Sequence, residues 1–165
     1  MNPEVRADAL ELWHDRHHVH LDEQLLCVIE DLMAVDVTAA VSRWTTWVAE
    51  LREGLALEDQ MILPAYRAMP PLAPQGRIDV VEGDHVLLDR GILAIDELCQ
   101  SLQSPTSAST RRREVALGLP LVYRLRGILE HHGERERRHV YPRVVPMLSS
   151  VDRDAAVAVL SRLAG

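Results

Sequence analysis

A histidine and a glutamate in the segment 130–142 form the strongest chemical pattern in the chain. His132 is followed four residues later by Glu136, and on an α-helix this spacing places an imidazole and a carboxylate on one face, about one turn apart. Burying a carboxylate is costly unless it has a partner, so the pair predicts either a bound metal ion or a buried hydrogen bond between the two side chains. Both residues fall on a stripe of apolar positions spaced by three and four: Leu121, Leu125, Ile128 and Val140.

The same residue types recur in an internal repeat. Residues 18–28 match residues 85–95 in their order of histidine, aspartate and aliphatic residues, which pairs His18 with His85. Residues 58–64 match residues 136–142, which pairs Glu58 with Glu136 and ends each segment on a proline. The repeat predicts two helical hairpins that each contribute one half of a site.

Helical periodicity dominates the rest of the chain, and strand patterns are nearly absent. Proline at position 3 favours a helix start, and the first helix is expected to run to about Met33. The second helix is expected after a cap at Asp36 or Thr38, and the third is expected from about Arg77 to about Leu102. The segments that break the pattern, and that should connect the helices, are residues 69–76 and 104–109.

The fourth helix is expected to begin at a cap on Ser109 or Thr110, to kink at Pro120 and to pass through Glu136. A short helix over about 151–163 closes the chain. Four long helices with short connections predict an all-α fold, an antiparallel up-down-up-down four-helix bundle with a short C-terminal helix. The chain is expected to form one domain over residues 1–165, with the bundle core at about 10–148.

Ligand-type residues fall at similar heights along all four predicted helices. Counting residues from the connections places three histidines and two carboxylates within about two turns of one another along the bundle axis. They are His18, Glu58, His85, His132 and Glu136. This set of nitrogen and oxygen donors suits iron, manganese or zinc, and it lacks the thiolates of a structural zinc site. The residues therefore predict a metal-binding helical bundle.

The order of these residues resembles that of the hemerythrin family, the HHE cation-binding domain, from Trp13 to Leu148. The matching elements are a histidine, a glutamate followed six residues later by proline, a second histidine, and the His132-x-x-x-Glu136 pair followed by a second such proline. The resemblance implies a non-haem di-iron centre with an open position for oxygen. It also implies that Glu58 and Glu136 bridge the irons and that the histidines are terminal ligands.

Two positions depart from the family pattern. Gly54 stands four residues before Glu58, where the family has a histidine, and Val81 stands where oxygen-carrying members have a second histidine one turn before His85. The missing ligand could be replaced by His14, for which a place at the surface is the alternative, or by water or a substrate. The site could also hold one metal ion or none. Gly54 is further expected to leave a cavity through which a small molecule reaches the metals.

Other polar and aromatic residues receive less specific predictions. Asp22 and Asp89 are candidate acceptors for the second ring nitrogen of a metal-bound histidine, with exposed helix charges as the alternative, and Asp59 is expected to face away. Solvated positions are expected for His17, His20, His131 and His139. Packing roles are expected for Trp13, Trp44, Trp47, Tyr66, Tyr123 and Tyr141.

Charge and composition narrow the classes of function. A net charge of -7 argues against nucleic-acid binding, and no apolar run approaches the ~20 residues of a membrane span. The first residues lack the basic and apolar pattern of a signal peptide, so a cytoplasmic location is expected. Cys27 and Cys99 show neither a disulfide framework nor zinc spacing and are expected to be buried free thiols.

Three functions remain as expectations. The first is a non-haem di-iron protein that binds or reacts with O2, NO or peroxide for sensing, storage or detoxification. The second is a di-iron enzyme that activates oxygen and oxidises a small organic substrate in the space left by Gly54. The third is a metal-free helical interaction module. The sequence leaves the oligomeric state open.

Overall fold

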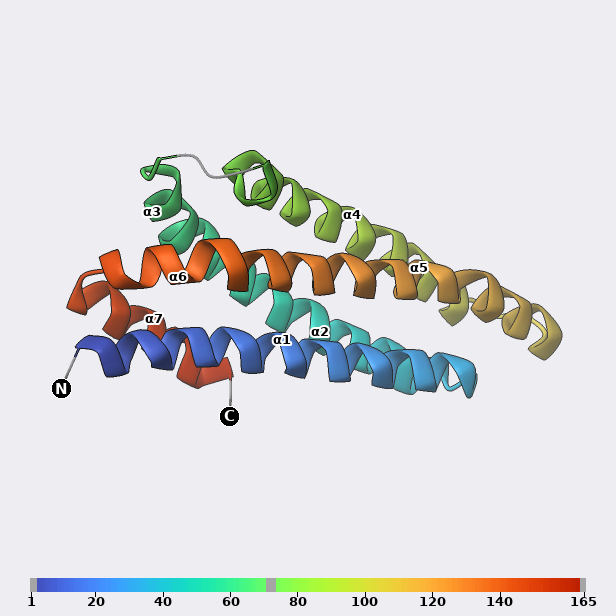
Figure 1. The fold of residues 1–165 in the computed structure, drawn as a ribbon. Coiled ribbons are helices and arrows are strands. Elements are labelled where there is room, and N and C mark those ends of the chain that lie inside the picture. Colours follow the sequence, from blue (N-terminus) through green and yellow to red (C-terminus); the bar gives the residue numbers. More distant parts are fainter. Residues whose placement is uncertain (1–2, 71–73, 164–165) are drawn as a thin grey trace.

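The computed structural model describes residues 3–70 and 74–163, and over these ranges it contains helices and no strands (Figure 1). The long helices are α1 (Pro3–Met33), α2 (Val37–Leu57), α4 (Ile78–Gln103) and α5 (Ala108–Arg135). The shorter ones are α3 (Leu63–Arg67), α6 (Tyr141–Val144) and α7 (Ser150–Leu163). Two π-helical turns cover Glu58–Ile62 and Glu136–Val140, and two 3-10 turns cover Pro74–Gly76 and Val145–Met147. The prediction of an all-helical chain is confirmed.

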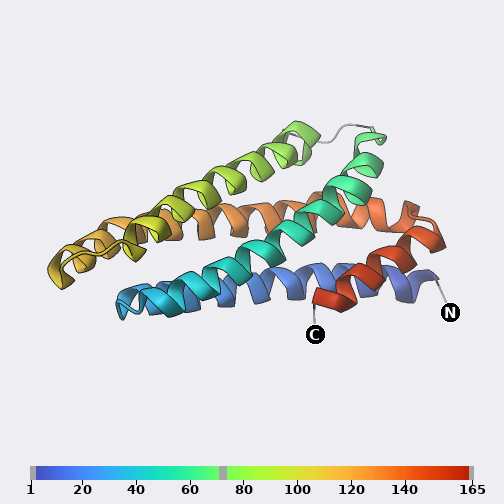
Figure 2. The same cartoon turned by 180° about the vertical axis from the view of Figure 1, so that it is seen from behind.

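The long helices enclose a common interior. α1 contacts both α2 and α5, and α4 contacts the same two helices, while the colours of Figure 1 show that successive long helices run in opposite directions. Seen from behind, α7 folds back over α1 and α2 (Figure 2). Among the described residues, no helix combines the length and the apolar character that crossing a membrane requires.

The helix ends agree with the sequence except on α5. Asp36 caps α2, as predicted, by accepting a hydrogen bond from the Ala39 amide at 3.0 Å. α5 begins after Ser107, whose hydroxyl accepts from the Thr110 amide at 3.1 Å, so its cap is not Ser109 or Thr110. Pro120 lies inside α5, where the sequence placed it.

Two hydrophobic clusters fill the interior and leave a polar layer between them. One cluster contains Trp44 and Trp47, whose stacked rings lie 5.1 Å apart, which confirms the packing role of these tryptophans. The second cluster includes Val81 and Val140. His18, His85 and His132 lie on the long helices between residues of the first cluster and residues of the second, and Glu58 follows Leu57 of the second cluster. On α5 the buried apolar positions are Val115, Val122, Leu125 and Leu129, whereas Leu121 is exposed.

Candidate metal centre

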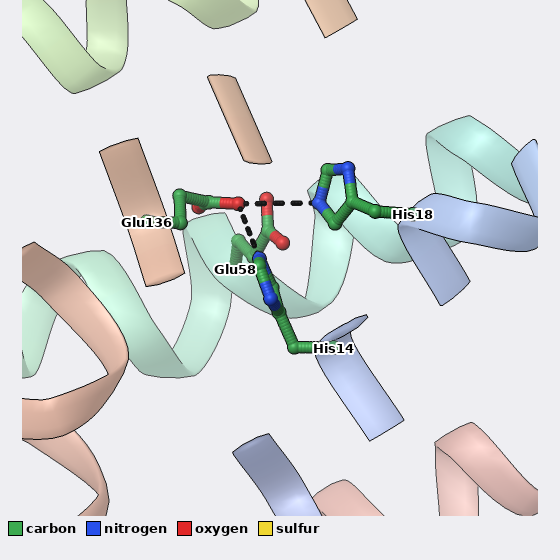
Figure 3. Close-up of side chains that lie close together, drawn as sticks. All are labelled: His14, His18, Glu58 and Glu136. Atoms are coloured by element: carbon green, nitrogen blue, oxygen red, sulfur yellow. Dashed lines mark hydrogen bonds and ion pairs between the residues drawn. The ribbon is translucent and has the colours of Figure 1, made fainter. Parts of the chain in front are cut away.

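Six side chains converge in the polar layer. His14, His18, Glu58 and Glu136 form one group, and Glu58, His85, His132 and Glu136 form the other. Within each group the ligand atoms lie within 4.8 Å of one another. Figure 3 shows the first group, in which both imidazoles of α1 point toward Glu136. The structure thus brings together the five residues predicted for the site and His14, which was predicted as a possible additional ligand, and both carboxylates belong to both groups.

The two carboxylates occupy equivalent positions in unusual helical turns. Glu58 and Glu136 each begin a π-helical turn, in which the amide five residues later donates to the glutamate carbonyl. In both cases a proline stands six residues after the glutamate. Because proline has no amide proton and its ring clashes with the carbonyl four residues earlier, a wider turn accommodates it. The internal repeat therefore places both carboxylates at the start of a π-helical turn. The sequence patterns did not predict these turns.

α1 supplies two imidazoles to Glu136. Nε2 of His14 lies 3.2 Å from Oε2 of Glu136, and Nε2 of His18 lies 3.5 Å from the same oxygen. Only 2% of His14 is exposed, so its ring turns inward and does not lie at the surface. The ring of His18 fits because Gly133 has no side chain, since a Cβ there would lie 2.6 Å from Nδ1 of His18.

α4 and α5 complete the second group. Nε2 of His85 lies 3.5 Å from Oε2 of Glu58, and Nε2 of His132 lies 3.6 Å from that oxygen and 3.2 Å from Oε2 of Glu136. Both Nε2 atoms, Oε2 of Glu58 and Oε1 of Glu136 are buried without a hydrogen-bond partner. Leaving a buried polar atom unpaired costs about 1–3 kcal/mol. Without a bound ligand, the polar layer therefore lowers the stability of the folded chain.

Both carboxylates favour the charged state despite their burial. Burial alone would raise the pKa of Glu58, but the neighbouring His132 and His85 outweigh it and hold that pKa well below its usual value. The pKa of Glu136 is also lowered, against burial and the charge of Glu58, by His132 and the imidazoles of α1. The two carboxylates in turn raise the pKa of His132 to about 9, although burial opposes this. The centre thus attracts positive charge, as protons on imidazole or as a metal cation.

Asp59 supports His85, so the prediction that it faces away is wrong. Its Oδ1 lies 3.0 Å from Nδ1 of His85 and can accept a hydrogen bond from it, which directs Nε2 into the cluster. Carboxylates commonly orient metal-bound histidines in this way. The aspartates predicted for this role lie elsewhere, because Asp22 accepts two hydrogen bonds from Arg126 at 2.6 and 2.8 Å and Asp89 is exposed.

His17 fills the space beside Gly54, where the sequence predicted a cavity. A Cβ on Gly54 would lie 2.8 Å from Nε2 of His17, so the ring already occupies the room that the glycine leaves. The ring stacks on Trp13 with 4.6 Å between centroids and is 8% exposed. The predictions of a solvated His17 and of an open cavity are therefore both wrong, because α1 packs against α2 as well as against α5.

Tyr141 also reaches the cluster, although the sequence indicated only packing. Its ring centroid lies 4.3 Å from that of His14, and its hydroxyl donates toward Oε1 of Glu58 at 3.5 Å. Burial and the two nearby carboxylates raise its pKa well above the usual value, so the phenol remains a protonated donor. Its place five residues after Glu136, at the end of the π-helical turn, is the signal that could have identified it.

The other histidines predicted to be solvated, and the two cysteines, are not part of the cluster. His131 is exposed, while His20 and His139 are partly exposed. Cys27 and Cys99 are free thiols, of which Cys99 is buried and Cys27 only partly buried.

A groove between α1 and α5 leads to the cluster from outside. It has a volume of about 920 Å³, and its lining includes His14 and His18. Its two arginines are paired with lining carboxylates, Arg126 with Asp22 and Arg137 with Glu134. Three further carboxylates line it: Asp15, Glu23 and Glu130. The groove beside the cluster is therefore acidic, and its volume has room for small molecules or ions.

Comparisons of the chain with protein-family models, with curated proteins and with solved structures find no match. The metal centre is accordingly inferred from the residues and their geometry.

Proposed function

We propose that this chain is a hemerythrin-like protein, an antiparallel up-down-up-down four-helix bundle that holds a non-haem pair of metal ions in its polar layer. The observation that carries the proposal is that Glu58 and Glu136 belong to both four-residue groups. Carboxylates shared in this way can bridge two ions, each of which then has two histidines of its own. Inward-facing glutamates and histidines on facing helices are the usual way in which bundles form di-metal sites.

The donor atoms fit such a pair. The unpartnered atoms of Glu58, His85, His132 and Glu136 are the nitrogen and oxygen types that bind iron, with manganese or zinc as alternatives. Two histidines with a carboxylate and open coordination positions are typical of non-haem iron proteins that react with oxygen. We therefore propose iron as the resident metal.

The proposed ligand is a small diatomic molecule or peroxide, bound for sensing, storage or detoxification. A bound iron pair supplies the capacity to bind or reduce O2, NO or hydrogen peroxide. The chain provides the surroundings, because a hydrophobic cluster on each side of the polar layer limits the entry of water. His18, the most exposed side chain of the cluster at 16%, places one end of the site at the groove between α1 and α5.

An oxygen-activating enzyme is the second candidate, and the groove is the observation that favours it. A small organic substrate would approach through the groove that His14 and His18 line. It would not use the space beside Gly54, which the ring of His17 occupies.

The metal content per chain tests the proposal, together with the visible spectrum in air and after reduction. Protein from iron-supplemented cells is expected to contain about two irons per chain and to show bands of a bridged iron pair that bleach on reduction. The variant Glu136→Gln keeps the side-chain shape but removes a bridging carboxylate, so its iron content is expected to fall. Glu97→Gln changes an exposed residue of α4 and is the matched control.

Each other outcome has a distinct meaning. One iron per chain would contradict the bridged pair. Oxygen consumption that depends on an organic substrate would support the enzyme. No bound metal, with a melting temperature that chelators leave unchanged, would overturn the proposal in favour of a metal-free interaction module.

A further inference from the structure

The two halves of the site that the internal repeat relates differ in the residue four positions before each glutamate. The repeat that pairs Glu58 with Glu136 also pairs Gly54 with His132. α5 and the π-helical turn after it therefore contribute an imidazole and a carboxylate, whereas α2 and the π-helical turn after it contribute only a carboxylate. The helices α1 and α4, which precede α2 and α5, also differ in one side chain, and here the imidazole is in the first half. The repeat that pairs His18 with His85 pairs His17 with Asp84, so α1 has an imidazole where α4 has a carboxylate.

His17 lies against Gly54 in the structure. Nε2 of His17 lies 2.8 Å from the point where a Cβ of residue 54 would be. In the other half, Asp84 is close enough to His132 to help raise the pKa of that histidine, and it accepts a hydrogen bond from Arg135 at 2.7 Å. Each half therefore has one imidazole at the equivalent place. In one half α5 supplies it as His132, and in the other half α1 supplies it as His17, next to Gly54.

The imidazole of His17 is available for a ligand. It is 8% exposed, and its Nε2 is buried without a hydrogen-bond partner. An unpaired buried nitrogen is costly, and stacking on Trp13 does not satisfy it because that contact involves the ring faces.

We propose that His17 is a metal ligand of the α1 half of the centre, supplied across the helix pair in place of a side chain at position 54. This inference rests on the proposed function. His17 lies outside the two four-residue groups, so its side chain turns toward Glu58 when it coordinates. With His14 and His18, it makes α1 the source of three imidazoles for one ion, while the other ion has His85 and His132.

The variant His17→Phe tests the inference, because it keeps a ring against Trp13 and removes only the nitrogen donors. Titration with Co2+, followed by its visible bands, and with Fe2+ is expected to show one unchanged site and one site weakened at least about 10-fold. His20→Phe changes a partly exposed histidine on the same helix and is the matched control. Circular dichroism and the melting temperature before metal addition establish that both variants are folded.

A relocated imidazole provides the second test. Gly54→His alone is expected to disturb the site, because its Cβ would meet the His17 ring. The double variant His17→Ala with Gly54→His removes this clash and is expected to recover the weakened site relative to His17→Ala. Two wild-type-like sites in both His17→Phe and His17→Ala would overturn the inference and leave the proposed function intact. Failure of the wild-type chain to bind metal would overturn the proposed function itself.

Discussion

Gly133→Ala should weaken metal binding through His18, while the same change at Gly127 should not. A Cβ at position 133 would lie 2.6, 2.8 and 2.9 Å from three atoms of the His18 ring, so the whole ring must move. At Gly127, in the same helix, a Cβ meets nothing within 4 Å. The two substitutions are chemically identical and differ only in what the new methyl group contacts.

The magnitudes follow from two opposing terms. Replacing a helical glycine by alanine stabilises the chain by roughly 0.5–1 kcal/mol, and Gly127→Ala should show this gain. Overpacking costs about 1–3 kcal/mol, so Gly133→Ala should be less stable than Gly127→Ala by about that amount. For a chain of this size the difference corresponds to roughly 2–12 °C in melting temperature. His18 can turn into the groove, so the loss of metal affinity should exceed the loss of stability.

Thermal unfolding of the metal-free variants and metal titration of both variants check this reasoning. Gly133→Ala is expected to bind at least one ion about 10-fold or more weakly than Gly127→Ala. Equal melting temperatures and equal affinities in the two variants would show that Gly133 does not position His18, and the proposed geometry of the α1 half would be refuted.

Three further predictions concern other parts of the chain. Asp59→Asn should lower metal affinity about 10–100-fold, because His85 loses its charged partner, while Asp89→Asn should not; equal titration curves would contradict this. Chelation should lower the melting temperature by about 8–16 °C if metal is present at a thousandfold excess over its dissociation constant, as scanning fluorimetry can measure, and an unchanged value would refute metal-linked stability. Burial, with a contribution from a nearby aspartate, raises the pKa of Cys99 to about 11, so a thiol reagent at pH 8 should modify Cys27 first, and mass spectrometry showing equal rates would contradict the burial of Cys99.

Features that depend on neighbouring residues in the chain could be predicted from the sequence. The first helix ends at Met33 and Asp36 caps the second, as expected, because periodicity and capping are local. The spacing of His132 and Glu136 could be interpreted for the same reason, since four residues along one helix fix their common face. The heights of the ligand-type residues followed from helix lengths and short connections.

The orientation of the α1 histidines could not be predicted in this way. His14, His17 and His18 lie within a little more than one turn, and which of them is buried depends on the helices that pack against α1. Because α1 packs against both α2 and α5, His17 is buried against Gly54 while the other two meet Glu136. A single apolar stripe predicts one buried face, and α1 has two.

The sequence by itself determined the helices, the donor types and their approximate common layer, because these depend on residue chemistry and on distances along one helix. Only the tertiary structure decided which donors share an oxygen, which glycines admit a ring and which aspartate supports a histidine. Those pairings join residues on different helices, and they depend on how each helix is rotated about its axis. The π-helical turns at Glu58 and Glu136 alter that rotation, and a pattern with a constant period of 3.6 residues does not include such a change.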